Sequence, residues 1–130
     1  MFSWKRPGNL GVVDGRLAPP KRTPNCVSSQ ADPEDAEHYI APLAFRGDFS
    51  AIEKAVAGMR GATVLRREGS YLYAECRTPL MRFVDDLELL YDAGAGLVHA
   101  RSASRLGRRD FGVNRKRVEE LRARLSAAAA

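Results

Sequence analysis

The segment 62–104 constrains the fold most, because runs of strand-forming residues alternate in it with residues that form turns. Gly69, Pro79 and the loop 92–96 interrupt these runs at spacings typical of antiparallel hairpins. We therefore predict a meander of four consecutive strands. Their expected bounds are residues 62–67, 71–78, 83–91 and 97–104.

The second expected strand indicates which face of the sheet is apolar. Leu72, Ala74 and Cys76 alternate along it with larger or polar side chains. Successive side chains of a strand point to opposite faces, so these residues share an apolar face while the other face is mixed. Cys76 is accordingly predicted to be a small core residue, and Tyr71 and Tyr73 to lie on the mixed face.

A helix is expected before the meander, beginning at Ser50. Ser50 and Glu53 have the spacing of a capping box, in which each side chain accepts a hydrogen bond from a free backbone N–H of the first turn. Gly61 is expected to end this helix. Its apolar residues share one face, which is expected to cover the sheet. They are Ile52, Ala55, Val56 and Met59.

A second helix is expected from about Asn114 into the alanine tail, with Val118, Leu121 and Leu125 facing the sheet. Asn114 is a favourable N-cap, yet the first turn holds three cations. Helix N-termini favour anions, so these cations need compensation, either from a bound anion or from carboxylates of the chain itself. The cations are Arg115, Lys116 and Arg117.

Both kinds of compensation predict a cluster at the same place. The hairpin of strands 83–91 and 97–104 brings Asp85 and Asp86 close to residues 102–105 in any register. We predict that a small anion or an acidic protein surface binds at Arg101, Arg105, Asn114, Arg115 and Arg117. The supporting residues are predicted to be Asp85, Asp86, Ser102, Ser104 and Asp110.

The N-terminal part of the chain differs from the rest in composition. Proline and glycine are frequent in residues 1–38, which are predicted to be an irregular arm. Residues 39–130 are predicted to form one α+β domain, in which a mainly antiparallel sheet of four to five strands is packed by two helices. A strand at 39–45 is expected to be an edge strand because Pro42 cannot donate a hydrogen bond.

Charge is concentrated at the two ends of the chain. The net charge is +4 for residues 1–25, −5 for 26–100 and +6 for 101–130. The basic C-terminal segment makes nucleic-acid binding an alternative function. We expect nucleic acid to be an unlikely partner because neither an RNP-type motif nor a helix-turn-helix pattern is present.

Catalytic chemistry has little support in the sequence. His38 and His99 do not have metal-ligand spacing, so no metal and no cofactor are expected, and no catalytic residue is assigned. A small hydrolase is the alternative. It would use Cys26 as nucleophile, or Ser102 with His99 and Asp86.

Several separated motifs resemble one known family in their order and sequence. They are Gly15–Pro19, Pro24–Gln30, Phe83–Glu88, Arg101–Gly107 and Asp110–Glu119. On these motifs the chain resembles, from about Gly15 to Leu125, the uncharacterised family filed as domain of unknown function fourteen ninety-nine (DUF1499). The resemblance implies a bacterial or plastid protein and brings no reaction with it.

Two departures from that family bear on this chain. Relatives often have a second cysteine shortly before the position of Cys26, where this chain has Pro20-Lys21-Arg22, so a local disulfide is not expected. Many relatives begin with a membrane or export segment, and we expect this chain to have no transmembrane segment and to be cytoplasmic. The predicted function is that of a non-enzymatic binding or scaffold domain.

Overall fold

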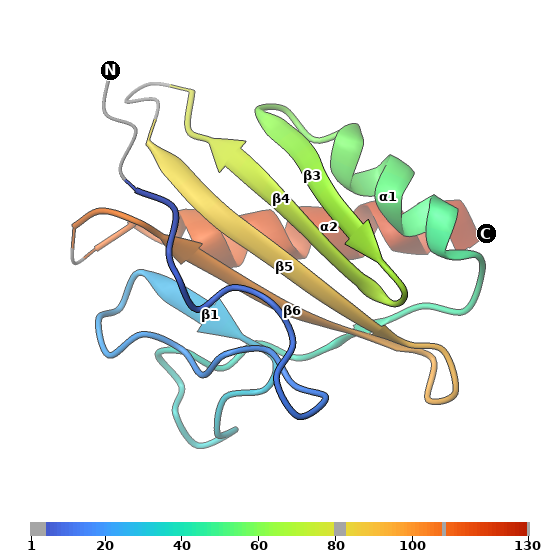
Figure 1. Cartoon of the computed structure of the whole chain (residues 1–130), viewed down its shortest axis with the longest axis horizontal. Helices are drawn as coiled ribbons and strands as arrows, with labels where there is room; N and C mark the ends of the chain where they lie inside the picture. Colours follow the sequence, from blue (N-terminus) through green and yellow to red (C-terminus); the bar gives the residue numbers. More distant parts are fainter. Residues whose placement is uncertain (1–4, 80–82, 108, 130) are drawn as a thin grey trace.

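Antiparallel pairing extends through the segment 62–104, as the alternation of its side chains predicts. In the computed structural model, which describes residues 5–79, 83–107 and 109–129, the four expected strands pair in sequence (Figure 1). Their bounds are β3 Ala62–Glu68, β4 Tyr71–Arg77, β5 Val84–Asp92 and β6 Leu97–Ser104. The predicted meander is thus confirmed, and the structure has the predicted α+β class.

Two short strands extend the sheet beyond the meander. β1 (Cys26–Ser28) and β2 (Leu43–Ala44) both pair with β6, which gives a six-stranded sheet in the order β1-β6-β5-β4-β3 with β2 off this path. β1 belongs to the segment expected to be irregular, and its three residues are too few for an alternation to be visible in the sequence. β2 is shorter than the expected strand 39–45 and begins after Pro42.

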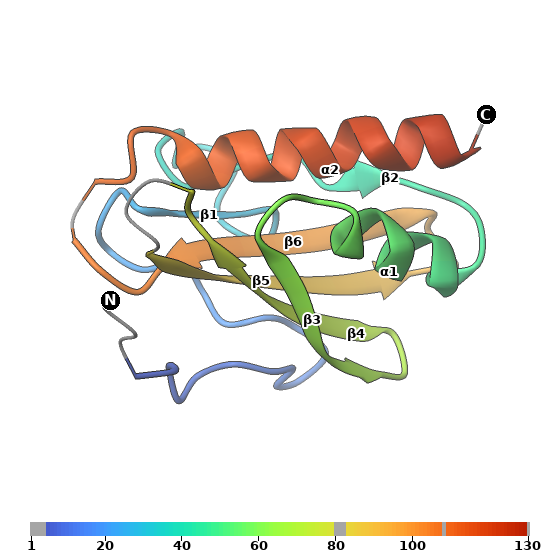
Figure 2. The ribbon, with the colours of Figure 1, turned by 90° about the horizontal axis from the view of Figure 1, so that it is seen from above.

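Both helices pack on one face of the sheet (Figure 2). α1 spans Phe49–Ala57 and α2 spans Val113–Ala129. The predicted cap of α1 was wrong, because Asp48 is the N-cap and its side chain accepts a hydrogen bond from the Ser50 backbone N–H at 2.8 Å. Gly61 does not end the helix either, since Gly58 is its C-cap and Gly61 lies in the turn that leads into β3.

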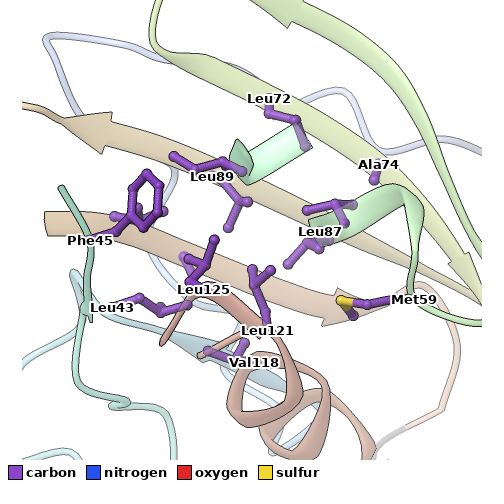
Figure 3. Packing of buried hydrophobic residues seen from close by; sticks show 14 of the residues in the cluster. Leu43, Phe45, Met59, Leu72, Ala74, Leu87, Leu89, Val118, Leu121 and Leu125 are labelled. Atoms are coloured by element: carbon purple, nitrogen blue, oxygen red, sulfur yellow. The ribbon is translucent and has the colours of Figure 1, made fainter. Parts of the chain in front are cut away.

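The main core lies between the helices and this face of the sheet (Figure 3). Leu87 and Leu89 of β5 meet Leu121 and Leu125 of α2, and all four are at most 1% exposed. Cys76 is 2% exposed within the same core, which confirms its predicted role. Burial of these apolar side chains is the main favourable contribution to folding.

Residues 5–19 of the N-terminal arm cover the opposite face of the sheet (Figure 2). Leu17 of this arm packs with Tyr71 and Tyr73, which are only 5% and 1% exposed. The mixed face predicted from the alternation is therefore buried as well. Its polar groups must consequently find partners inside the protein.

Gly61 provides a test of the turn between α1 and β3. Its φ is +83°, and a Cβ there would lie 2.4 Å from the carbonyl oxygen of Arg77. Gly69 has a φ of +57° with no atom within 4 Å of a Cβ, so it is a matched control for backbone strain alone. We expect the free energy of unfolding in urea to fall by about 1–2 kcal/mol for Gly69→Ala and by at least about 3 kcal/mol for Gly61→Ala. Equal losses would contradict the close approach.

Candidate functional site

The predicted cluster is divided between the two faces of the sheet. Asp85 pairs with Ser104 across β5 and β6, whereas Asp86 pairs with Ala103, so the neighbouring aspartates point in opposite directions. We call the group beneath α2 the helix-side cluster: Asp85, Ser102, Ser104, Asp110, Asn114 and Arg117. We call the group beneath the arm the arm-side cluster: Tyr73, Glu75, Asp86, Glu88, Arg101 and Arg105.

Asn114 is the centre of the helix-side cluster. Its Oδ1 accepts hydrogen bonds from Ser102 Oγ at 2.7 Å and from Arg117 Nη1 at 2.8 Å. Its Nδ2 lies 2.8 Å from both Ser104 Oγ and Asp110 Oδ2. Since the Asn114 side chain is completely buried, these contacts replace the water it gives up and fix the start of α2 against β6.

Asp110 supplies the anion that the first turn of α2 lacks. Its Oδ2 accepts from the Asn114 backbone N–H and its Oδ1 from that of Gly112, both at 3.0 Å. Burial acts to raise the pKa of Asp110, but the hydrogen bonds from Asn114 and Gly112 outweigh it and leave the pKa below its ordinary value. The predicted N-cap was therefore wrong: Asn114 lies inside the helix, and Asp110 receives the free N–H groups.

Asp85 and Arg117 form a buried ion pair within the same cluster. Arg117 Nη2 lies 2.8 Å from Asp85 Oδ2, and the Asp85 side chain is 1% exposed. Burial raises the pKa of Asp85, and this increase is opposed by Arg117 and Ser104. Both Asp85 oxygens are buried, and the donor groups that approach them belong to Arg117 and Ser104.

Arg115 lies apart from both clusters. Its Nη2 donates to the carbonyl oxygens of Tyr39 at 2.9 Å, Ala36 at 3.3 Å and Glu37 at 3.4 Å. It thereby connects the first turn of α2 to the chain before β2. Carbonyl oxygens, rather than a carboxylate, offset its charge.

Arg105 is the best-paired cation of the arm-side cluster. Its Nε and Nη2 donate to the two oxygens of Asp86 at 2.9 and 2.8 Å, and Nη2 also lies 2.7 Å from Glu75 Oε2. The Asp86 hydrogen bonds are the main reason that the pKa of Arg105 lies above its ordinary value. Burial and the hydrogen bond to Asp86 raise the pKa of Tyr73 too.

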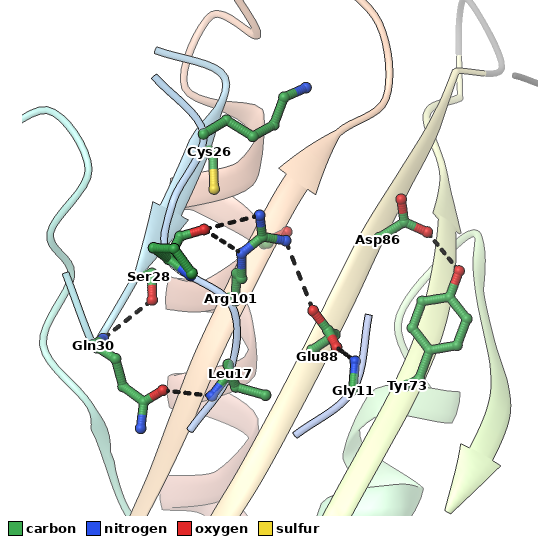
Figure 4. A network of polar contacts seen from close by, with 12 residues as sticks. Gly11, Leu17, Cys26, Ser28, Gln30, Tyr73, Asp86, Glu88 and Arg101 are labelled. Atoms are coloured by element: carbon green, nitrogen blue, oxygen red, sulfur yellow. Dashed lines mark hydrogen bonds and ion pairs between the residues drawn. The ribbon is translucent and has the colours of Figure 1, made fainter. Parts of the chain in front are cut away.

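Arg101 and Glu88 connect the sheet to the arm (Figure 4). Arg101 donates to the Pro19 carbonyl oxygen through Nε and Nη2, both at 3.2 Å. Glu88 Oε2 accepts from the Gly11 backbone N–H at 2.7 Å. The two side chains approach each other at 3.7 Å between Arg101 Nη1 and Glu88 Oε1, so their ion pair is looser than that of Arg105.

Sequence reasoning missed Tyr73, Glu75 and Glu88 as members of a polar cluster. The signal was present in the alternation of β4, which places Tyr73 and Glu75 on one face. It was not decisive, because the same pattern is typical of a sheet with one face in water. The arm covers these side chains and adds partners to those that the sheet itself supplies, namely Arg6 for Glu75 and the Gly11 backbone N–H for Glu88.

The side chains considered as nucleophiles of a hydrolase are neither accessible nor activated. Cys26 and Cys76 are buried free thiols, and burial raises the pKa of both, to about 11 for Cys76. Ser102 Oγ is buried and donates to Asn114. His99 and Asp86 belong to the opposite face, and His99 Nδ1 lies 3.0 Å from Ser29 Oγ. These positions disfavour the hydrolase alternative.

Other ligand-type groups have ordinary structural partners. In the described ranges, no three His, Cys, Asp or Glu side chains are grouped as metal ligands would be. Two arginines of the basic C-terminal segment, Arg122 and Arg124, pair with Glu119 and Glu120 on their own helix. Among residues 5–79, 83–107 and 109–129, no helix has the length and hydropathy required to span a bilayer.

The role of Asn114 is tested by Asn114→Asp. Aspartate cannot donate to Ser104 and adds a negative charge beside Asp110. We therefore expect the free energy of unfolding in urea to fall by about 3 kcal/mol or more. Asn9→Asp makes the same change at an exposed position and should alter the free energy of unfolding by less than about 0.5 kcal/mol. Similar values for the two variants would refute the role of Asn114 as a buried centre.

Thiol labelling tests the protection of the cysteines. At pH 7 we expect Ellman's reagent to react with the folded protein at least about tenfold more slowly than with the urea-unfolded chain, because burial disfavours the thiolate. The unfolded chain should release two equivalents of colour, one for each cysteine. A thiol that reacts as fast in the folded protein would instead support Cys26 as a nucleophile.

Comparison with known proteins gives a family and no activity. No curated protein matches the chain, and no solved structure matches it. The model of one family, described as a protein of unknown function, matches residues 16–125 and so includes both polar clusters. The chain therefore belongs to the DUF1499 family.

Proposed function

We propose that this chain is a non-enzymatic binding domain for a small anion, which binds between the N-terminal arm and the sheet. The observation that carries the proposal is a pocket of about 220 Å³ with four cationic side chains and one carboxylate in its lining. The cations are Lys5, Lys21, Arg101 and Arg105, and the carboxylate is that of Asp86. This excess of positive charge favours an anionic ligand.

The lysines supply the charge that the protein leaves uncompensated. Lys21 Nζ donates to the Ser104 carbonyl oxygen at 2.6 Å and has no ion pair within the described residues. Lys5 is exposed at the pocket. Arg105 is held by two carboxylates, so it contributes a fixed direction for hydrogen bonding more than free charge.

The predicted ligand-binding residues take different parts in this proposal. Arg101 and Arg105 line the pocket and contact the anion, with Asp86 orienting Arg105. Asn114, Arg115 and Arg117 act from a distance, since they fix α2 and do not line the pocket. A direct role of these three residues in anion binding stays a prediction.

The volume of the pocket limits the ligand. Sites for drug-sized molecules typically have about 300–1,000 Å³. A pocket of about 220 Å³ is smaller and suits inorganic phosphate, sulfate or a single carboxylate group. Phosphate is the preferred probe because its oxygens can bind the guanidinium and ammonium groups together.

Phosphate titration followed by thermal unfolding tests the proposal. A ligand that binds the folded state stabilises it by about 2.7 kcal/mol at one hundred times its Kd. We expect phosphate to raise the Tm of the wild type above that in chloride at equal ionic strength. Lys21→Gln should reduce this increase strongly because it removes a cation from the pocket.

Lys54→Gln is the matched control, since Lys54 is exposed on α1 and the substitution changes the net charge equally. It should retain the full response to phosphate. Equal responses of the Lys21 and Lys54 variants would locate binding elsewhere. A wild type that responds to phosphate no more than to chloride would refute the anion site.

A further inference from the structure

The chain immediately before β1 is held by side chains instead of by backbone pairing. Residues 20–24, which we call the linker, lead from the part of the arm that covers the sheet to β1 (Figure 1). Among the described residues, the linker's backbone groups make no backbone–backbone hydrogen bond. Lys21 Nζ donates to the Ser104 carbonyl oxygen at 2.6 Å, and the Thr23 carbonyl oxygen lies 2.9 Å from His38 Nε2. The position of the linker therefore depends on such side-chain contacts.

The His38 ring lies between two groups that can only accept hydrogen bonds. Nδ1 is 2.7 Å from Asp35 Oδ2, and Nε2 is 2.9 Å from the Thr23 carbonyl oxygen. His38 is only 7% exposed, so water has little access to replace either partner. A neutral imidazole carries one N–H and can donate to one of the two acceptors, whereas the protonated ring donates to both. The geometry therefore matches the protonated ring.

The charged groups that face the ring are carboxylates. Asp35 and Glu37 belong to the same turn as His38, and Glu37 Oε1 lies 3.6 Å from His38 Nε2. Arg115 of α2 reaches this turn too, but it donates to backbone carbonyl oxygens. The ring thus faces net negative charge, which favours its protonated form. The other charged residues on the segments around it are Lys21 and Arg22 of the linker, and Arg109 and Asp110, which line a pocket together with Glu37.

The two histidines of the chain differ in the direction of their pKa shifts. Burial acts to lower the pKa of His38, but the Thr23 carbonyl and the carboxylates of Asp35 and Glu37 outweigh it and raise the pKa above its ordinary value of about 6.5. The contribution of His38 to stability is therefore complete below about pH 6.5 and is lost as the pH rises through the higher pKa of the folded state. Burial lowers the pKa of His99, so His99 is neutral throughout that pH range.

We propose that His38 is a pH-dependent switch, which holds the linker to the turn 35–38 while its ring is protonated and releases it when the ring loses its proton. The remaining N–H of the neutral ring stays with Asp35, because a charged acceptor makes the stronger hydrogen bond. Nε2 then presents a lone pair to the Thr23 carbonyl oxygen, and the contact is lost. Thr23, Asp35 and His38 do not line the anion pocket, so the switch does not depend on anion binding.

Proton NMR of the two imidazole rings tests the protonation of His38 in the wild-type protein. We expect the His38 ring to titrate at higher pH in the folded protein than in the urea-unfolded chain, and the His99 ring to titrate at lower pH. Because the chain has only two histidines, the spectrum of His38→Gln assigns both rings. A His38 midpoint at or below that of the unfolded chain would overturn the proposal.

Asp35→Asn tests the source of the shift. It removes the charge beside Nδ1, so the His38 midpoint should fall relative to the wild type. Glu34→Gln removes one negative charge from an exposed side chain nearby and should leave the midpoint unchanged. Equal midpoints in the two variants would refute the role of Asp35.

Tryptic cleavage after Arg22, an exposed linker residue, tests the release. The rate is divided by that of a synthetic peptide of residues 16–28, which corrects for the pH dependence of trypsin itself. Between pH 6.5 and 8.5 we expect this ratio to rise at least about twofold in the wild type, the lower limit for the loss of one hydrogen bond. A ratio that does not change would overturn the release.

The two histidine variants are the matched controls for this measurement. Glutamine does not titrate, so the ratio should be independent of pH in His38→Gln. His99→Gln should retain the rise of the wild type, because His99 is neutral throughout the range. The same pH dependence in both variants would overturn the switch. If His38→Gln does not fold, as far-UV circular dichroism would show, the NMR titration of the wild type still decides.

Discussion

The buried aspartates at the start of β5 govern the arrangement of this domain. Asp85 and Asp86 are neighbours in a strand, so the pleat sends their carboxylates to opposite faces of the sheet. Both are 1% exposed, and a buried carboxylate needs a cation or hydrogen-bond donors beside it. Arg117 of α2 meets one and Arg105, at the end of β6, meets the other. The Asp85–Arg117 pair thus ties α2 to the sheet, whereas the Asp86–Arg105 pair joins β5 to the residue that follows β6, on the face that the arm covers.

Such buried ion pairs contribute more to the selection of one strand register than to the net stability of the fold. Removing two charges from water costs about as much as their attraction returns, whereas breaking a buried pair costs about 3–5 kcal/mol. A shift of β5 by one residue would exchange the faces of Asp85 and Asp86 and expel Leu87 and Leu89 from the core. Charge and hydrophobicity therefore select the same register.

The strands of residues 62–104 could be predicted because the alternation of side chains and the turn residues are local features of the sequence. The placement of Asp85 and Asp86 near residues 102–105 followed from hairpin geometry. The division of the predicted cluster into two could not be predicted, because it depends on which layers cover each face. The pairing of Ser28 with Arg101 joins segments far apart in the sequence, and three residues carry no readable alternation. The residues that cap the two helices were not predicted. Asp48 and Asp110 accept the free backbone N–H groups, and each lies a few residues before Ser50 or Asn114, the residue expected to be the cap.

The outer strand β3 has a consequence for behaviour at high concentration. It is the last strand in the sheet order, so its outward N–H and C=O groups are available to a strand of another molecule. Its pairing with β4 shifts between Val64 and Arg66, and charged Arg66, Arg67 and Glu68 follow. An edge strand with an irregular register and several charged side chains is a poor template for pairing with a strand of another molecule. These features oppose self-association, although the apolar Leu65 on the same strand is 42% exposed.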